Sequence, residues 1–269
     1  MLQQAIDFGA ECAALDGFLQ ELAPEMWTHP TAFKGWTPNE ILLHLHHWNR
    51  AQDRALTDPE GFRQDVTRMF AAIAAGNARL EEARAADTRG DALRAVWAQS
   101  AAQIATRWRS VDPKQRLPWV GPDMSARSAM TARQMETWAH GLAIWDLVGR
   151  VRPEADRLRN IVHLGVSTFA WSHQVQGFET PAAMPYIELT APSGELWSYG
   201  THSEAERIEG AAVEFAMIVT QTRNAADTGL RLTGPIATRW MTHAQCFAGP
   251  RETPPPPGSR GLGVSVLPI

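Results

Sequence analysis

The stretch GWTPNEILLHLHHWNR, residues 35–50, decides how the first part of the chain folds. Thr37 suits the N-cap of a helix, Pro38 suits the first helical position, and Glu40 stands three residues after the cap. This pattern is a capping box, in which the side chains at both positions bind backbone N–H groups. It predicts a helix that begins near residue 38 and ends at Asp58-Pro59, with His44 about two turns from its start.

Three histidines, His44, His46 and His47, lie close together on this helix. Residues three or four apart share a helix face, whereas residues two apart do not. His44 and His47 can therefore point the same way, and His46 points elsewhere. At most two of the three imidazoles can contribute to one site.

A second segment, RQMETWAHGLAIWDLVG at residues 133–149, carries Glu136 and His140 in an i,i+4 relation. A carboxylate and an imidazole so placed lie on one helix face and can bind the same metal ion. Helical bundles build metal sites from such groups on facing helices. The spacing indicates a site in which His44 supplies a third ligand from the earlier helix and one coordination position stays open.

The pattern of apolar residues predicts further helices in the first half of the chain, at residues 2–22, 62–86, 91–110 and 126–148. Breaks at Pro24, at Asp112-Pro113 and in the loop PWVGPDMS, residues 118–125, separate them. Long helices joined by short loops indicate an α-helical, up-and-down four-helix bundle.

The pattern of apolar and polar residues changes after Pro153, which indicates a smaller α+β domain. Residues 159–177 have a helical pattern. The segment PYIELTAPSGELWSYG, residues 185–200, predicts two strands joined by a turn, and RIEGAAVEF, residues 207–215, predicts the end of a strand followed by a helix. We therefore predict a bundle at 1–152, an α+β domain at 153–250 and an extended tail rich in proline and glycine at 251–269.

Composition restricts the class of protein. A net charge of −4 and the lack of a Lys/Arg run argue against a nucleic-acid partner. No apolar stretch approaches the roughly 18 residues that span a bilayer, and no signal peptide is evident at the N-terminus. Two distant cysteines do not form a disulfide framework. We expect a cytoplasmic protein that binds neither membrane nor nucleic acid.

These motifs together resemble a known family. The GW pair, the histidine nine residues after Gly35, the E-x-x-x-H pair that runs into WDL, and the loop GPDMSAR at residues 121–127 are similar to the DinB-like metal-binding four-helix bundles. The closer likeness is to the branch that contains mycothiol-dependent maleylpyruvate isomerases, and the segments IELTAPSGELW and RIEGAAVEF resemble a sterol-carrier-like C-terminal domain.

The resemblance implies a metal triad of His44, Glu136 and His140, with His47 as the alternative ligand. It implies a divalent ion, with zinc favoured and nickel, manganese or iron as alternatives. It also implies a metal-dependent transferase or isomerase that uses a low-molecular-weight thiol and a small-molecule substrate. Members of the family also dimerise, through a face that the sequence does not identify.

Five residues are candidates for lining the site: Trp36, Trp48, Asp123, Met124 and Arg133. Each tryptophan can equally be a core residue, and the chain has eleven of them. Arg133, three residues before Glu136, can either bind an anionic substrate or pair with Glu136.

An alternative function remains open. The bundle can be a non-enzymatic, metal-stabilised scaffold, and the C-terminal domain can bind an apolar ligand in a cavity lined by Trp171, Trp197 and Phe215.

Overall fold

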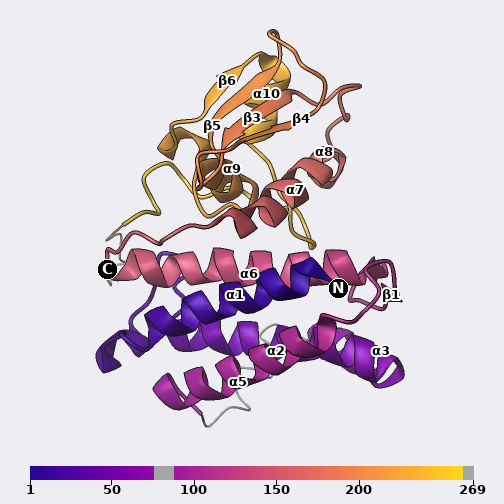
Figure 1. Cartoon of the computed structure of the whole chain (residues 1–269), viewed down its shortest axis with the longest axis vertical. Helices are drawn as coiled ribbons and strands as arrows, with labels where there is room; N and C mark the ends of the chain where they lie inside the picture. Colours follow the sequence, from indigo (N-terminus) through magenta and orange to yellow (C-terminus); the bar gives the residue numbers. More distant parts are fainter. Residues whose placement is uncertain (76–87, 263–269) are drawn as a thin grey trace. The chain divides into compact units, whose positions relative to one another are not determined.

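The computed structural model describes residues 1–75 and 88–262, and Figure 1 shows it coloured along the sequence. The chain divides into two compact units, residues 1–141 and 142–269, and the division falls within the long helix α6, Ala126–Leu147. The boundary that the sequence suggests near residues 152–153 lies beyond the end of this helix and stays a prediction.

The first unit is a bundle of long helices, as the sequence predicts. Its helices are α1 (Gln3–Leu19), α2 (Pro38–Thr57), α3 (Pro59–Ala74), α5 (Gly90–Trp108) and the first part of α6. The short helix η1, Pro24–Thr28, follows α1, and the strands β1 (Arg116–Leu117) and β2 (Met124–Ser125) form a small antiparallel pair before α6. The segment 76–86 of the predicted helix 62–86 lies outside the described residues.

Hydrogen bonds between helix ends establish the direction of each helix. The N–H of Leu2 donates to the carbonyl of Arg109, so α1 begins where α5 ends and the two are antiparallel. Asn39, at the start of α2, accepts from the N–H of Gly90, at the start of α5. Helices α2 and α5 therefore run in the same direction. The bundle is present as predicted, but this parallel pair differs from the alternating directions of the up-and-down order that the sequence indicates.

Small residues let the helices of the bundle pack closely. A methyl group added at Gly9 would lie 3.0 Å from Cβ of Ala105, at the contact of α1 with α5. A methyl group added at Gly141 would lie 3.3 Å from the side chain of Leu15, at the contact of α1 with α6. The interior is filled by side chains that are almost fully covered, among them Phe8, Leu45, Trp97, Trp108 and Trp138. Burial of this apolar surface is the main driving force for the bundle.

The second unit is an α+β fold, which confirms the predicted class. Its sheet has the strand order β4-β3-β5-β6. The strands are β3 (Tyr186–Thr190), β4 (Leu196–Tyr199), β5 (Arg207–Ala211) and β6 (Arg231–Thr233). Strand β3 is antiparallel to β4, with Leu189 opposite Trp197, and parallel to β5. The predicted strand–turn–strand is therefore the β3–β4 hairpin.

Helices cover the inner side chains of this sheet. They are α7 (Arg159–Ser167), α8 (Phe169–Val175), α9 (Ala212–Val219) and α10 (Pro235–Met241), with the short helices η2 (Asp156–Leu158) and η3 (Ala225–Asp227). Ile187, Leu189, Ile208, Phe215 and Trp240 have no exposed surface. Alternation along β3, with Glu188 and Thr190 directed to the other side, is the period-2 pattern that predicted the strand.

The described part of the predicted tail, residues 251–262, lacks regular structure but is tied to the second unit. The side-chain amides of Gln176 and Asn224 donate to the carbonyls of Glu252 and Pro255 at 3.1 and 2.8 Å. The N–H of Gly258 donates to the carboxylate of Asp227. Residues 263–269 lie outside the described residues. Among the described helices, none is both long and apolar enough to cross a membrane.

Candidate metal centre

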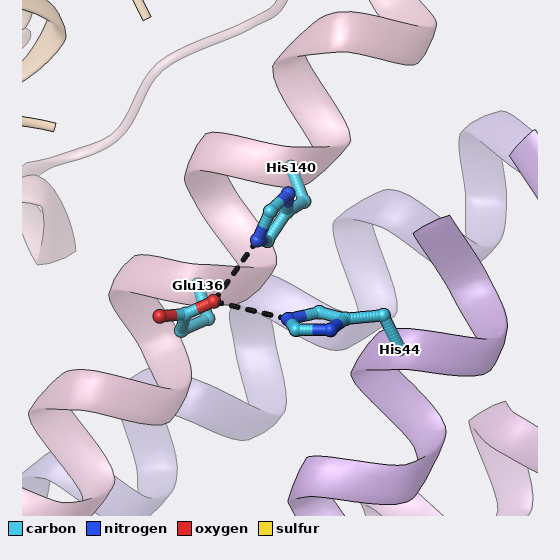
Figure 2. A group of neighbouring side chains, drawn as sticks. All are labelled: His44, Glu136 and His140. Carbon is cyan, nitrogen blue, oxygen red and sulfur yellow. Dashed lines mark hydrogen bonds and ion pairs between the residues drawn. The ribbon is translucent and has the colours of Figure 1, made fainter. Parts of the chain in front are cut away.

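The start of α2 places His44. The predicted capping box is present: the N–H of Glu40 donates to Oγ1 of Thr37 at 3.3 Å, and the N–H of Thr37 donates to Oε2 of Glu40 at 2.8 Å. Because the cap determines where the helix begins, it also determines the turn on which His44 lies. His44 is directed toward α6, on the face that meets Glu136 (Figure 2).

Glu136 and His140 lie one turn apart on α6 and their side chains converge. Figure 2 shows both reaching toward the imidazole of His44. A single carboxylate oxygen, Oε2 of Glu136, lies 3.0 Å from Nε2 of His140 and 3.4 Å from Nε2 of His44. The predicted i,i+4 spacing on α6 therefore brings the side chains of Glu136 and His140 together, and α2 adds the side chain of His44.

The geometry fits a shared metal ion. His44, Glu136 and His140 each offer one ligand atom, and these three atoms lie within 4.8 Å of one another. Among the described residues, no other group of three or more His, Cys, Asp or Glu residues meets this distance. A tetrahedral ion with bonds of about 2.0–2.1 Å separates its ligand atoms by about 3.3 Å. The two separations from Oε2 of Glu136, 3.0 and 3.4 Å, are close to that value. The two imidazole nitrogens and one carboxylate oxygen are also ligand types that zinc accepts.

Burial keeps His44 in the form that can bind a metal. Removal from water lowers the pKa of His44 from 6.5 to about 4, even though its hydrogen bond with Glu136 acts in the opposite direction. The imidazole is therefore neutral at pH 7. A neutral imidazole offers a lone pair to a metal without first releasing the second proton of the imidazolium ion.

Glu136 is ionised for a different reason. Burial alone would raise the pKa of its carboxyl group, but hydrogen bonds with His140 and His44 and the charge of Arg133 outweigh that effect. The pKa of Glu136 therefore lies well below its ordinary value of 4.5. The site thus presents one negative charge and two imidazoles. The side chains of His44, Glu136 and His140 keep exposed fractions of 18%, 21% and 13%, so the site is accessible to a ligand.

Aromatic rings surround the triad. Trp36 is stacked on His140 with 5.9 Å between ring centroids and an interplanar angle of 7°, and it meets His44 edge-on at 5.3 Å. Phe33 packs edge-on against His140 at 4.8 Å. Gly35, with φ of 70°, allows the turn that brings Phe33 and Trp36 to the same ring. This position explains why the GW pair belongs to the motif.

A second aromatic group, formed by Trp48, Trp119 and Phe62, lies next to the triad. Trp48 is 6.4 Å from His44 and 5.5 Å from Trp119, and Phe62 is stacked on Trp119 at 5.7 Å. We name these three residues the Trp48 cluster. Both predicted tryptophans, Trp36 and Trp48, therefore border the site and are only partly buried.

The other predicted residues lie in different positions. His47 is exposed, contacts the ring of Trp48 at 5.2 Å and is not among the three converging residues. Asp123 is also exposed, and its carbonyl accepts from the guanidinium of Arg116. Met124 is half-buried in β2, opposite Leu117 of β1. The roles of these residues, and those of the triad as ligands, remain predictions.

Arg133 is buried beside the triad, with a side-chain exposure of 5%. Its Nη2 lies 3.9 Å from Oε1 of Glu136, which is too long for a hydrogen bond. Its guanidinium carbon lies 5.5 Å from the ring centroid of Trp119. The two uses of Arg133 that the sequence left open are both compatible with this position.

Sequence reasoning missed Phe33, Phe62 and Trp119 as neighbours of the site. Trp119 stands in the loop PWVGPDMS, which was noted as a break, and Phe33 stands two residues before Gly35. An aromatic residue next to a recognised motif was the available signal. Nothing in the local pattern of Phe62 connects it to the histidines.

Comparison with known proteins identifies the family. Residues 8–145 match the sequence model described as "Mycothiol maleylpyruvate isomerase N-terminal domain". The chain belongs to this family. The match covers the whole predicted triad and confirms the family that the motifs of the sequence resemble.

Relatives and solved structures extend the comparison. Proteins from two strains of Mycobacterium tuberculosis, CDC 1551/Oshkosh and H37Rv, both described as uncharacterized, are 38% identical over 255 residues, which is 91% of this chain and 95% of each relative. A crystal structure of the mycothiol-dependent maleylpyruvate isomerase matches with a TM-score of 0.54 at 15% identity, over 86% of this chain and 91% of that one. A histidine-to-alanine mutant of the isomerase matches with a TM-score of 0.53 at 14% identity, over 80% and 87%. At these identities the structures show a shared fold.

Proposed function

We propose that this protein is a metal-dependent enzyme of the mycothiol-dependent maleylpyruvate isomerase type, which uses a small thiol in a transfer or isomerisation reaction. The observation that carries the proposal is the convergence of His44, Glu136 and His140 on one point. Three protein ligands leave a coordination position for a further molecule, which distinguishes a catalytic metal site from a closed structural one.

In this proposal, His44 and His140 bind a divalent ion through Nε2 and Glu136 binds it through Oε2. Zinc is the ion that this ligand set favours, with nickel, manganese and iron as alternatives. A divalent ion bound there would lower the pKa of a coordinating thiol, so that the nucleophilic thiolate forms near neutral pH. The thiol would be mycothiol, bacillithiol or glutathione, and it would react with an electrophilic small molecule.

The chain's own residues prepare the site for this chemistry. The rings of Trp36 and Phe33 both pack against the ring of His140, which restricts its orientation. His44 is neutral at pH 7 and Glu136 is ionised, so both are in the state that binds a metal. The partly buried aromatic rings around the triad limit the access of water, which strengthens electrostatic interactions within the site.

Elemental analysis of protein purified without an affinity tag tests the metal site. We expect one divalent ion per chain in the wild type and in the His47→Ala variant, and loss of the ion in His140→Ala. His47→Ala is the matched control because it removes an imidazole from the same region of α2 without touching the triad. Sub-stoichiometric metal in the wild type, or an unchanged metal content in His140→Ala, would contradict the proposal.

Calorimetric titration of the zinc-loaded protein with the three thiols tests the use of a thiol. We expect one of them to bind to the zinc-loaded protein and not to the chelator-treated protein. If none binds, the metal-stabilised scaffold becomes the favoured function. The apolar-ligand alternative stays a prediction. Trp197 and Phe215, which it places at a cavity, are buried with exposures of 2% and 0%, whereas Trp171 is 38% exposed.

A further inference from the structure

Arg133 is a cation enclosed by the bundle, and most of its guanidinium is out of reach of solvent. Its Nε and Nη1 atoms are buried and have no hydrogen-bond partner among residues 1–75 and 88–262. A dissolved molecule has no exposed surface through which to reach these two atoms. Arg133 therefore acts on the groups that already lie beside it.

Two contacts hold the guanidinium in place. Its Nη2 forms an ion pair with Oε1 of Glu136 at 3.9 Å, and its central carbon lies 5.5 Å from the ring centroid of Trp119, within the range of a cation–π interaction. Trp119 is itself stacked on Phe62, which is 2% exposed. The cation is thus held one helical turn before Glu136 on α6.

The two oxygens of Glu136 face different partners. Oε2 lies 3.0 Å from Nε2 of His140 and 3.4 Å from Nε2 of His44, whereas Oε1 forms the ion pair with Arg133. Figure 2 shows the second carboxylate oxygen directed away from both imidazoles. Only Oε2 is therefore placed to share an ion with the two histidines.

This division matters because both oxygens of a carboxylate can bind a cation. If both oxygens of Glu136 bound the ion, the carboxylate would take the position that three single ligand atoms leave open. The guanidinium opposes this in two ways. It attracts Oε1 toward itself, and its permanent positive charge repels a divalent ion from that side of the carboxylate, with little screening inside the protein.

Packing alone does not account for a charge at this position. Burial lowers the pKa of Arg133, which reflects the free energy required to remove the charged guanidinium from water. An uncharged side chain of similar length would fill the same space without that desolvation. The charge itself therefore has a use, and the charged group beside it is the carboxylate of Glu136.

We propose that Arg133 is a positioning residue that keeps the fourth coordination position open: it retains Oε1 of Glu136, so that the carboxylate binds a divalent ion through Oε2 alone. This inference rests on the proposed function for the presence of the ion. It adds the means by which the chain reserves a position for the incoming thiol.

Metal titrations of four proteins test the inference: wild type, Arg133→Met, Arg133→Lys and the matched control Arg127→Met. Arg127 is an exposed arginine on the same helix. Zinc affinity is measured at pH 7 by competition with a chromophoric chelator. The d–d absorption of the cobalt(II)-loaded proteins reports the coordination number, because four-coordinate cobalt(II) absorbs more strongly than five- or six-coordinate cobalt(II). Near-ultraviolet circular dichroism checks that each protein is folded.

We expect Arg133→Met to bind zinc roughly 10- to 100-fold more tightly than the wild type, because it removes a unit positive charge close to the ion. Its cobalt(II) form should absorb more weakly, because Oε1 then joins the coordination. Arg133→Lys keeps the charge, and it should resemble the wild type, as should Arg127→Met. A purely structural role predicts the opposite sign, since a disturbed Glu136 would bind zinc more weakly.

Three results would overturn the inference: a zinc affinity of Arg133→Met equal to or below that of the wild type, an unchanged cobalt(II) spectrum in that variant, or an Arg133→Lys that behaves like Arg133→Met. If Arg133→Met does not fold, the neutral Arg133→Gln takes its place with the same expected result. If neither folds, the wild type decides: the strong absorption of four-coordinate cobalt(II) supports the inference, and the weak absorption of a higher coordination number overturns it.

The same titrations separate the inference from the proposed function. If the wild type binds no zinc while Arg133→Met does, Arg133 opposes the ion as inferred and the metal-dependent function falls. If none of the four proteins binds zinc, both fall.

Discussion

The depressed pKa of His44 predicts a stability that depends on pH. Between the ordinary pKa of 6.5 and the value of about 4 in the folded protein, the unfolded chain binds a proton at this residue and the folded chain does not. The free energy of unfolding therefore rises with pH over this window and falls as the solution is acidified. Each pH unit corresponds to about 1.4 kcal/mol.

The magnitude follows from this window. Between pH 5 and 6.5, His44 should contribute about 2 kcal/mol to the pH dependence of the metal-free protein. The variant His44→Asn cannot titrate at this position. The packing and hydrogen bonds that the substitution removes lower the free energy of unfolding at every pH, so this loss cancels when the stabilities of one protein at two pH values are compared.

Urea unfolding in the presence of a chelator, at pH 7 and pH 5, measures the effect. We expect the loss of stability on going to pH 5 to be about 2 kcal/mol larger in the wild type than in His44→Asn. Titrating groups that do not contact His44, such as the buried His243, act in both proteins and drop out of the difference. Equal losses in the two proteins would refute the reasoning, because His44 would then be protonated as readily in the folded protein as in the unfolded chain.

Three further predictions concern stability and are measured by the same unfolding assay at pH 7. Asp146→Ala should lower the free energy of unfolding by about 3–5 kcal/mol, because the buried Arg223 loses the carboxylate that lies 2.7 Å from its Nη2. A decrease below about 1 kcal/mol would show that the pair is solvated. Thr37→Ala should cost about 1 kcal/mol by removing the cap of α2, and Thr37→Ser should restore most of it. Gly165→Ala should cost about 1–3 kcal/mol because the added methyl group would lie 2.8 Å from the Val219 side chain; an unchanged midpoint would mean that α7 and α9 can separate without cost.

The residue pairs that are close along the chain could be predicted from the sequence. The capping box of α2 joins residues three apart, and the Glu136–His140 pair joins residues four apart on one helix. The β3–β4 hairpin joins strands across a short turn. In each case the geometry of a single helix or turn determines the distance, so local spacing is sufficient.

The choice of the third ligand required the packing of α2 on α6. On an isolated helix, His44 and His47 share a face, and the sequence cannot decide which of them meets Glu136. The structure directs His44 to α6 and leaves His47 exposed beside Trp48. A rotation of α2 about its axis would exchange the two, and the burial of its apolar face prevents that rotation.

The sequence by itself determined the start of α2 and the Glu136–His140 pair of the proposed metal centre, because these follow from spacing within single elements. The resemblance of its combined motifs indicated the family. Only the tertiary structure decided that Phe33 and Trp36 contact the ring of His140, that Trp119 lies against Arg133, and that Nε and Nη1 of Arg133 have no acceptor among the described residues. These contacts join residues of different elements and depend on how the apolar faces of several helices are buried together. No pattern within one element specifies that arrangement.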